Sequence, residues 1–484
     1  MTMWLPRLQA GAGPRYLAIA EALAGDVRAG RLVPGARLPT HRELAHRLGV
    51  TVGTVSRAYG EAERRGLIAA HVGRGTYVAA PGPGIGQGER PGEHALDAIY
   101  RPRGDGEGLG EGLGESLDLS LNYPHTPSLT AGLAAGLAGL ARLDETTLAG
   151  IGSYQPPSGM PAHRSAAVRW LQRLGIAADP EDIVIVPGCQ GGLLAAFMAL
   201  ARAGETVLTE ALTWPGMRAA TTPLGLRVQP VAMDAEGLRP DALEAACRAH
   251  RPRLLYTMPS LHNPTCIVMP EPRRREIAAI ARAHELFVIE DDVYGFLLDD
   301  RPPPLRSFLP ELGLYVTSLS KSVAPGLRVG YLWAPAALRS RLAGAVRANV
   351  LMTSPVSAEL ASQLILSGAA AEAAERQRTQ ARRRQRMAAE RLAGLAVSTH
   401  PASFHLWLRV PPAWRPGELA ARLADRGVAV TPGEAFAGDA SVEEADDHVR
   451  LCLCAIGSDE RFARAIDIVA EVARGGSTDA LPVV

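Results

Sequence analysis

The chain has 484 residues, of which 47% are hydrophobic and 21% are charged, and its formal net charge is +1. This length is too great for a single hydrophobic core and predicts two or three domains, while the composition is ordinary for a soluble globular protein. No apolar run has the length of a signal-peptide core or of a bilayer-spanning helix, so we expect no membrane partner and a cytoplasmic protein.

Cysteine and charge add two constraints. The five cysteines are scattered and odd in number, which favours reduced thiols over a disulfide framework. Cys452 and Cys454 lie in an apolar strand-like run without a second ligand pair, so we expect core residues and no metal site. Residues 1–80 hold 11 arginines and 5 acidic residues, a surplus of six positive charges. A small basic segment on a mildly acidic body predicts a polyanion as the partner of that segment only.

The first segment has the start and stop signals of three short helices. Residues 14–30 carry apolar side chains at helical spacing. A second helix is expected within residues 40–49, where Thr40 and Glu43 have the spacing of a capping box. A third is expected within residues 51–66, because a glycine again ends the pattern.

These helices belong to a predicted domain at residues 13–80. The third helix is expected to bury Val52, Val55 and Tyr59, and residues 67–78 alternate around a glycine-rich turn, as in a two-stranded wing. Two short helices, a tight turn and a hairpin predict a winged helix-turn-helix. The second helix of such a pair enters the DNA major groove with its N-terminal residues foremost.

The candidate DNA contacts are polar side chains of this motif, although each is equally well explained as a solvated surface residue. Hydroxyl and guanidinium donors on the third helix would face the bases, and cations from the preceding helix and the wing would hold phosphates. In chain order these residues are Arg42, Thr51, Thr54, Ser56, Arg57, His71 and Arg74.

A change of composition divides the chain. Residues 81–116 are rich in Gly, Pro and charge, without a sustained apolar period, which predicts a flexible linker. Residues 117–475 then alternate helical stretches with short apolar β-rich runs. The candidate strands are 182–186, 206–210, 226–233, 253–259, 286–292, 314–320 and 328–334. This pattern predicts a doubly wound α/β domain with ligand sites at the carboxyl ends of its strands.

One residue of this second domain stands out by its type. Lys321 is the only lysine, and the other 50 cationic residues of the Lys and Arg count are arginines. A lysine can lose its proton and attack a carbonyl, whereas a guanidinium stays protonated. A need for a primary amine therefore explains the exception better than chance survival.

The residues around it predict a site for pyridoxal 5'-phosphate, with Lys321 holding the cofactor as a Schiff base. Asp291, at a strand end, would pair with the ring nitrogen and make the ring an electron sink. Tyr294 and Asn263 would hydrogen-bond the phenolic oxygen. Arg328, seven residues after the lysine, would supply a bidentate fork to the phosphate.

Further groups would complete this site. Ser318 and Ser320 flank the lysine, and the glycine-rich turn within residues 186–197 would offer amides at a helix N-terminus. Trp214 would stack on the ring. Each signal alone is weak, because a carboxylate at a strand end is often a cap and a tryptophan is most often core. Their combination in this order is specific.

The two domains resemble known families. Residues 13–79 resemble the DNA-binding domain of GntR-type bacterial regulators, although Val52 stands where that family often has a basic residue. Residues 117–470 resemble fold-type I aminotransferases of class I/II, with Asn-Pro-Thr at 263–265 and Ser-x-Ser-Lys at 318–321. The combined layout is similar to the MocR subgroup of GntR regulators.

The resemblance implies further site residues and a further subdomain. Tyr154 would reach the phosphate bound by a neighbouring subunit, and Arg450, with Asn263, would bind a substrate carboxylate. Cys189 and Gln190 would occupy the phosphate turn. The large domain would carry a smaller C-terminal α+β subdomain.

The resemblance also implies partners. The protein would be a homodimer, often head-to-tail, in which the cofactor or an amino compound alters recognition of an operator near its own or a neighbouring gene. Cys266 replaces the glycine that usually follows Asn-Pro-Thr in the family, which leaves the substrate fit open.

Three functions remain open at this point. The first is a DNA-binding regulator that senses pyridoxal phosphate or an amino compound, and it is favoured because an enzyme alone has no need for residues 13–79. The second is a working aminotransferase in which Lys321 acts as general base. The third is a scaffold with a degenerate site and no cofactor.

Overall fold

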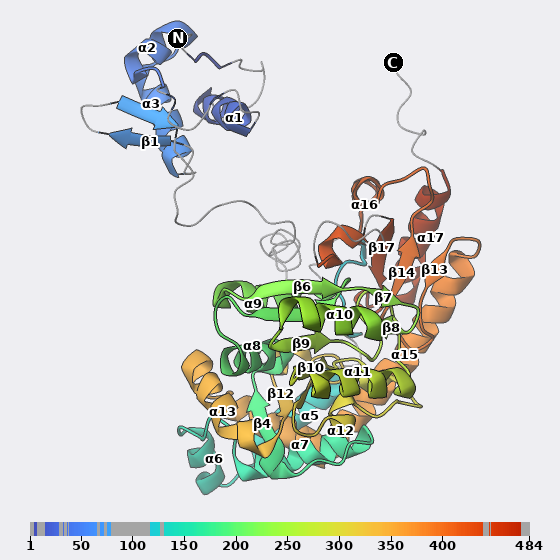
Figure 1. The fold of residues 1–484 in the computed structure, drawn as a ribbon. Coiled ribbons are helices and arrows are strands. Elements are labelled where there is room, and N and C mark those ends of the chain that lie inside the picture. Colours follow the sequence, from blue (N-terminus) through green and yellow to red (C-terminus); the bar gives the residue numbers. More distant parts are fainter. Residues whose placement is uncertain are drawn as a thin grey trace. The chain divides into compact units, whose positions relative to one another are not determined.

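A computed structural model of the chain describes residues 4–6, 15–28, 32, 36, 38–64, 68–71, 75–78, 117–125, 130–438, 445 and 447–475. The chain divides into two compact units, Met1–Glu89 and Arg90–Val484, termed here the N-terminal unit and the large unit. The predicted linker at residues 81–116 lies outside the described residues. Figure 1 shows the elements of both units, coloured along the chain.

The N-terminal unit is a helix-turn-helix followed by a two-stranded wing (Figure 1). Its elements are α1 (Arg15–Arg28), α2 (His41–Leu48), α3 (Val52–Arg64), β1 (Ile68–His71) and β2 (Gly75–Val78). Its core includes Ile19, Leu44 and Val55. The predicted capping box of α2 is confirmed, because Glu43 N–H donates to Thr40 Oγ1 and Thr40 N–H donates to the Glu43 carboxylate, both at 3.3 Å.

One buried position predicted on α3 is wrong. Val55 and Tyr59 are buried as expected, and the Tyr59 hydroxyl donates to the backbone carbonyl of Pro39 at 2.9 Å. Val52 instead exposes 45% of its surface. Val52 is the first residue of α3, and the apolar stripe that this helix buries against the core does not extend to its first residue.

The large unit is built on a seven-stranded sheet with the strand order β4-β12-β11-β10-β9-β5-β6 (Figure 1). In chain order the strands are β4 (Ile183–Val186), β5 (Thr206–Glu210), β6 (Arg227–Val231), β9 (Leu254–Thr257), β10 (Phe287–Asp291), β11 (Gly313–Ser318) and β12 (Gly330–Trp333). β12 runs antiparallel to both neighbours, and the other pairs are parallel. Every predicted strand is therefore observed. Such strands are apolar throughout because helices cover both faces of a parallel sheet.

The helices of this part surround the sheet. They are α5 (Thr130–Leu140), α6 (Glu145–Ile151), α7 (Pro161–Arg173), α8 (Gly188–Leu200), α9 (Pro215–Thr221), α10 (Pro240–His250), α11 (Glu271–Ala283), α12 (Leu305–Phe308), α13 (Ala336–Val350) and α14 (Pro355–Leu366). α8 packs against β10, β11 and β12, and α14 packs against α5, α6 and α7. A short hairpin, β7 (Met233–Asp234) with β8 (Gly237–Leu238), follows β6.

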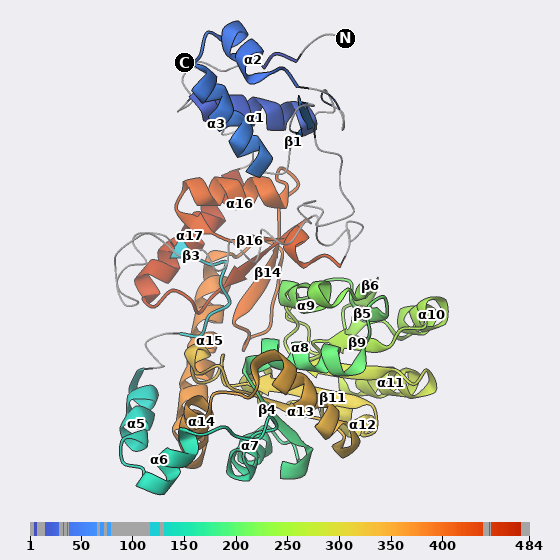
Figure 2. The same cartoon turned by 90° about the vertical axis from the view of Figure 1, so that its left-hand side faces the viewer.

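The long helix α15 (Ala369–Arg391) leads into a smaller subdomain (Figure 2). Its antiparallel sheet has the order β13-β14-β17-β16. The elements are β13 (Val397–Ser398), β14 (His405–Arg409), α16 (Pro416–Asp425), β15 (Val428–Ala429), β16 (Thr431–Pro432), β17 (His448–Cys452) and α17 (Asp459–Gly475). β3 (Leu117–Asp118) pairs in parallel with β15, which places these two residues in this subdomain.

The predicted fold class is confirmed. A winged helix-turn-helix precedes an α/β domain that carries a smaller α+β subdomain. Among the helices that the structure describes, none combines the length and the apolar character needed to cross a bilayer.

Candidate functional site

The polar residues singled out in the large unit meet in one hollow of about 610 Å³. β10 ends at Asp291, β11 ends three residues before Lys321, and β4 leads into the turn at Gly188. Because the carboxyl ends of parallel strands meet at one edge of a sheet, these segments face the same space. The hollow is lined by Cys189, Gln190, Trp214, Asn263, Asp291, Tyr294, Ser318, Ser320, Lys321, Arg328 and Arg450, together with other residues.

Lys321 presents its amine to this hollow. The Nζ of Lys321 donates to the backbone carbonyl oxygen of Asn122, which is a neutral acceptor. Loss of hydration disfavours the charged form and lowers the pKa of Lys321 from 10.5 to about 8. About a tenth of the amine is therefore neutral at pH 7, and the neutral form is the one that attacks a carbonyl.

Asp291 has one satisfied and one free oxygen. Its Oδ2 accepts a hydrogen bond from the Tyr256 hydroxyl at 2.8 Å, whereas its buried Oδ1 has no hydrogen-bond partner among the residues that the structure describes. Burial raises the pKa of Asp291 from 3.8 to about 7, because a lone carboxylate is poorly solvated there. A cationic ring nitrogen at Oδ1 would supply the missing partner and favour the ionised form.

Tyr294 is held by residues that the sequence did not single out. Asn122 Nδ2–H donates to Tyr294 Oη at 2.7 Å and to Nδ1 of His405 at 3.1 Å. His405 in turn donates from Nε2 to the backbone carbonyl of His262 at 3.1 Å, which assigns its proton to Nε2. Burial lowers the pKa of His405 to about 3, so the ring stays neutral. Since Tyr294 Oη accepts from Asn122, its own proton stays available for donation to a ligand.

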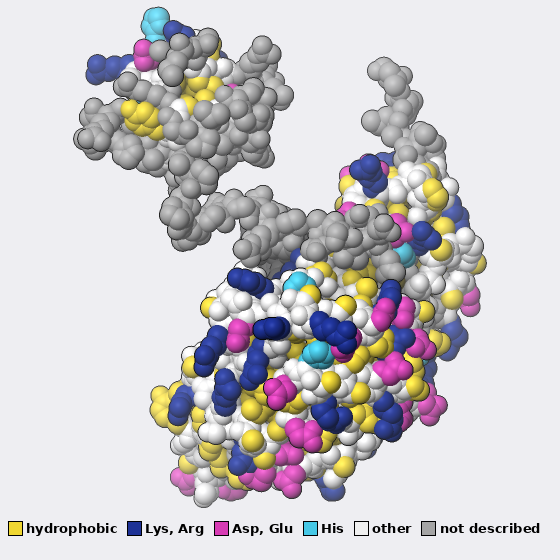
Figure 3. Space-filling model, viewed as in Figure 1, with side chains coloured by type: hydrophobic (Ala, Val, Ile, Leu, Met, Phe, Trp, Pro, Cys, Tyr) yellow, Lys and Arg dark blue, Asp and Glu magenta, His cyan; other side chains and the backbone are white. Residues whose placement is uncertain are grey.

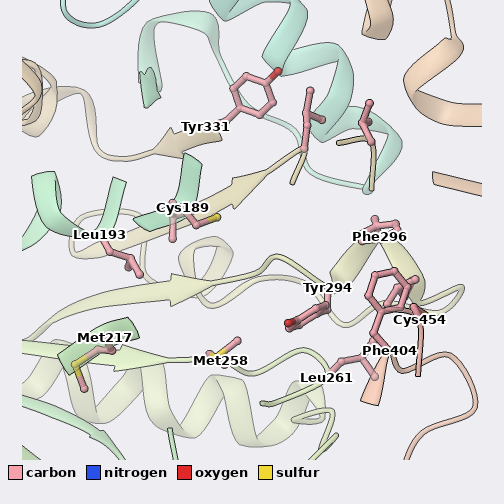
Figure 4. Close-up of a cluster of buried hydrophobic side chains, with 14 of the residues drawn as sticks. Cys189, Leu193, Met217, Met258, Leu261, Tyr294, Phe296, Tyr331, Phe404 and Cys454 are labelled. Atoms are coloured by element: carbon pink, nitrogen blue, oxygen red, sulfur yellow. The ribbon is translucent and has the colours of Figure 1, made fainter. Parts of the chain in front are cut away.

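An apolar contact fixes the ring of Tyr294 as well. In Figure 4 this ring lies beside Phe404, from the smaller subdomain, and the two centroids are 6.2 Å apart in a T-shaped arrangement. Phe296 in turn packs on Phe404, and the centroids of these two rings are 6.0 Å apart. The hydroxyl of Tyr294 is thus positioned both by a hydrogen bond and by aromatic packing.

Arg328, together with Ser320 and Ser318, forms a polar part of the hollow that suits a phosphate. Arg328 donates to the backbone carbonyl of Pro187 at 3.2 Å, and its Nη1 lies 3.5 Å from Ser320 Oγ. Neither partner carries a negative charge, so the charge of the guanidinium stays available to an anion. Ser320 N–H donates to Ser318 Oγ at 3.3 Å, which tightens the turn before the lysine.

Gly188 makes room for this arginine. Its φ is +76°, and a Cβ there would lie 2.6 Å from Arg328 Nη2. The residue begins α8, whose first amides, including those of Cys189 and Gln190, lack partners within the helix. Amides and guanidinium together form a cradle for a phosphate group.

The loop of Trp214 borders the hollow next to this cradle. A Cβ at Gly216 would lie 2.2 Å from the indole of Trp214, so the ring packs directly on that backbone. The side-chain amide of Gln190 donates to the carbonyl of Gly216 at 3.1 Å. The Gln190 side chain therefore positions the Trp214 loop. Burial raises the pKa of Cys189 well above its usual value and keeps its thiol neutral.

Arg450 projects from β17 and is 4% exposed. It donates to Asn263 Oδ1 at 2.9 Å, to the backbone carbonyl of Ser120 at 2.6 Å and to Thr431 Oγ1 at 3.3 Å. The Phe436 ring lies 4.7 Å from its guanidinium carbon. All these partners are neutral, and its buried Nε has no partner within the described part of the chain. A buried cation held in this way suits a carboxylate ligand.

Tyr154 is the predicted cofactor residue that the hollow does not include. It exposes 85% of its surface and belongs to the segment that follows α6. Asn122, Tyr256 and His405 are residues that the sequence reasoning missed. Tyr256 and His405 lie in apolar strands, where they read as core, and Asn122 meets His405 across 283 positions of sequence. No local pattern marks such a pair.

The donor set fits pyridoxal phosphate. The unpartnered Oδ1 of Asp291 suits a cationic ring nitrogen, and the space without a Cβ at Gly188 suits the phosphate beside Arg328. Lys321 supplies an amine with a lowered pKa to the same hollow. These groups are what a phosphorylated aromatic aldehyde requires.

A second hollow, of about 490 Å³, lies at the amino-terminal edge of the same sheet. Its lining includes Arg227, Arg251 and Arg253, and Figure 3 shows arginine side chains gathered over α9, α10 and β6 on this face. No lysine lines it. The only lysine of the chain lines the other hollow, at the carboxyl edge of the sheet.

The N-terminal unit carries the predicted DNA contacts. Arg42 on α2 and Arg57 on α3 are exposed, as contacts to phosphates or bases require. The side chain of His71 and the whole of Arg74 lie outside the described residues.

The hydroxyl groups expected to face DNA are already bonded within the unit. Thr51 Oγ1 lies 2.9 Å from Thr54 Oγ1 and accepts from Thr54 N–H at 3.2 Å. Ser56 Oγ lies 3.1 Å from Nδ1 of His41 on α2. These bonds cap α3 and join it to α2. Each hydroxyl keeps further hydrogen-bonding capacity, so the DNA contacts expected of Thr51, Thr54 and Ser56 stay predictions.

Comparison with known proteins gives the same division of the chain. Residues 117–469 match the family described as aminotransferase class I and II, and residues 15–78 match the bacterial regulatory proteins of the gntR family. The chain is 30% identical to the HTH-type transcriptional regulator TauR of Rhodobacter capsulatus, over 92% of this chain and 94% of that one. It is 29% identical to the uncharacterized HTH-type transcriptional regulator YdeF of Bacillus subtilis, over 96% of each.

A solved structure is similar to the large unit. It is LysN, an alpha-aminoadipate aminotransferase from Thermus thermophilus, in complex with N-(5'-phosphopyridoxyl)-L-leucine. The TM-score is 0.67 at 25% identity, and the match covers 79% of this chain and 97% of that one.

Proposed function

Because the chain belongs to the aminotransferase class I and II family and carries a gntR-family module, the layout of MocR-type regulators, we propose that it is a DNA-binding transcriptional regulator dependent on pyridoxal 5'-phosphate. The observation that carries this proposal is the presence, in one chain, of an exposed recognition helix and of a hollow that fits the cofactor. The relatives named as HTH-type transcriptional regulators match along nearly their whole length and support it.

The large unit supplies the groups that would hold the cofactor. When bound, pyridoxal phosphate supplies an aldehyde that condenses with amines and a ring that withdraws electrons. Lys321 would bind the aldehyde, Asp291 would hold a proton on the ring nitrogen, and Arg328 with the first amides of α8 would bind the phosphate. Tyr294, its oxygen fixed by Asn122, would donate its proton to the phenolic oxygen.

The regulatory ligand would be an amino compound that also carries a carboxylate. Arg450 is buried, is bonded only to neutral acceptors and lines the same hollow as Lys321. An amine and a carboxylate on one ligand could therefore engage both residues. Asn263, which accepts from Arg450, would keep the guanidinium oriented.

A second copy of the chain is the proposed protein partner, in a homodimer of head-to-tail type. Large apolar side chains are exposed on neighbouring helices, with Leu137 on α5, Leu148 on α6 and Leu366 on α14 exposing 52%, 47% and 63%. Figure 2 shows these helices side by side. Exposed apolar side chains on helices that pack together suit burial against a partner. Tyr154 projects from the same region and would reach the cofactor of that partner.

The test is a footprint on the DNA upstream of the gene for this protein, with and without pyridoxal phosphate. The full-length parent should protect a defined segment, and the pattern or affinity should change with the cofactor. Lys321→Ala should keep DNA binding and lose the response, whereas Arg464→Ala, an exposed cation on α17, should retain it. Absence of any protected DNA, or an identical response of the Lys321 variant, would overturn the proposal.

A working aminotransferase is the second candidate. It is favoured by the joint presence of the lysine with a lowered pKa, the buried carboxylate and the carboxylate-binding arginine in one hollow. Lys321 would move the proton from the α-carbon of the amino compound. Half-reaction spectroscopy over a panel of amino acids decides, and no conversion of the cofactor to its amine form would exclude it.

A further inference from the structure

The start of the recognition helix carries an apolar side chain in water. Val52 exposes 45% of its surface, whereas Val55, Ala58, Tyr59 and Ala62 on the same helix are 0–3% exposed. Among the described residues of the N-terminal unit, Leu5 is the only other large apolar residue with comparable exposure. The structural role predicted for Val52 is therefore absent, and its methyl groups remain available to a partner.

The neighbouring polar groups leave this position prominent. Thr51 and Thr54 share a hydrogen bond, with their hydroxyl oxygens 2.9 Å apart, and Ser56 is bonded to His41. Gly53 carries no side chain beyond Val52. The tip of α3 thus presents two valine methyl groups and a bare glycine, next to hydroxyl groups that already take part in hydrogen bonds within the unit.

The major groove offers one apolar group for such a tip. Of the four base pairs seen from this groove, A·T and T·A present the C5-methyl group of thymine, and the remaining functional groups are hydrogen-bond donors or acceptors. The N-terminal residues of a recognition helix reach the base edges first. We propose that Val52 reads a thymine in each half-site through contact with its C5-methyl group.

This inference rests on the proposed DNA-binding function and adds a base preference to it. Arg57, one and a half turns further along α3, is exposed and would contact a phosphate or a guanine nearby. The absence of a Cβ at position 53 would allow the helix backbone to approach the groove closely.

The test begins with duplexes recovered by the full-length protein from a random-sequence library. Each thymine of a recovered site is replaced by deoxyuridine, which removes only the methyl group and keeps every hydrogen-bonding atom. At one position of each half-site the affinity of the parent should fall about fourfold, the value expected for one buried methyl group. Replacement at the other thymines should leave the affinity unchanged.

Variants assign the effect to Val52. Val52→Ala should bind the thymine duplex about fourfold more weakly than the parent does and should no longer distinguish thymine from deoxyuridine. Its unfolding temperature should equal that of the parent, since the side chain is exposed. Arg42→Ala, which removes a phosphate contact, should weaken binding to both duplexes equally and keep their ratio.

The outcomes separate this inference from the proposed function. If no sequence is recovered, DNA binding fails and the base preference fails with it. If the parent binds specific sites but no deoxyuridine replacement matters, the function stands and the inference is wrong. If a methyl effect persists in Val52→Ala, another residue reads the thymine, and the assignment to Val52 is wrong.

Discussion

Replacing Asp291 by asparagine should weaken cofactor binding and, at the same time, stabilise the cofactor-free protein. The side chain is 2% exposed, and Tyr256 donates its one hydrogen bond. Burial raises its pKa from 3.8 to about 7. Because the folded protein has the higher pKa, the contribution of this carboxyl to stability is complete below about pH 4 and is lost as the pH rises through about 7.

The magnitude follows from that shift. A difference of about three pH units corresponds to about 4 kcal/mol, and about 2–3 kcal/mol of it is lost between pH 5 and pH 8. An amide does not ionise, so the free energy of unfolding of Asp291→Asn should rise relative to the parent by that amount over the same interval. The amide also cannot neutralise a charged ring nitrogen. Loss of one partner from a buried charge pair costs about 2–5 kcal/mol, or at least about thirtyfold in affinity.

Two measurements check the expected gain in stability and the expected loss of cofactor affinity. Urea unfolding of the cofactor-free proteins at pH 5 and pH 8 is followed by tryptophan fluorescence, because five of the six tryptophans lie in the large unit. Titration with pyridoxal phosphate, followed by absorbance, gives the affinity. Asp300→Asn, the same change at an exposed position, should alter neither quantity.

A merely structural role for Asp291 predicts the opposite stability result. In that case the variant would be less stable than the parent at both pH values, and the difference would not depend on pH. Either that finding or unchanged cofactor affinity would refute the assignment of Asp291 Oδ1 to the ring nitrogen.

Three further predictions concern the remaining parts of the large unit. Gly188→Ala brings a Cβ within 2.6 Å of Arg328 at a φ of +76°, so the affinity for pyridoxal phosphate should fall about tenfold or more. The affinity for pyridoxal, which has no phosphate, should be unchanged in parallel titrations. The rate at which the cofactor attaches to Lys321, trapped with borohydride, should rise about tenfold per pH unit up to about pH 8 and then level off. A continued rise past pH 9 would show that the pKa of the amine is not lowered. Lys321→Ala should not be labelled. Leu366→Glu places a charge on the exposed apolar face, so the dimer should dissociate at least tenfold more readily in light-scattering measurements, and a monomeric parent would contradict the proposed interface.

Much of the chemistry was readable from local sequence. A lone lysine in an arginine-rich chain points to amine chemistry because a guanidinium cannot replace it. Asp291 and Lys321 follow apolar strand segments, and strands of one parallel sheet end at the same edge, so their proximity was predictable without knowing the path between them. The capping box of α2 depends on two residues three positions apart and was equally accessible.

Other features depend on how segments far apart in the sequence pack together. Asn122 is hydrogen-bonded to Tyr294 and His405, which are 172 and 283 positions away in the sequence. Asn122 follows β3, which pairs in parallel with β15, and a strand of two residues has no recognisable sequence pattern. Val52 fits a helical apolar pattern, yet it is exposed because a pattern gives direction around a helix and not where the surrounding core stops. Local sequence patterns therefore specify which reactive groups this protein has and which strand ends carry them. The packing of distant segments decided which neighbours set their pKa values and protons, since burial and hydrogen bonding act through space and not along the chain.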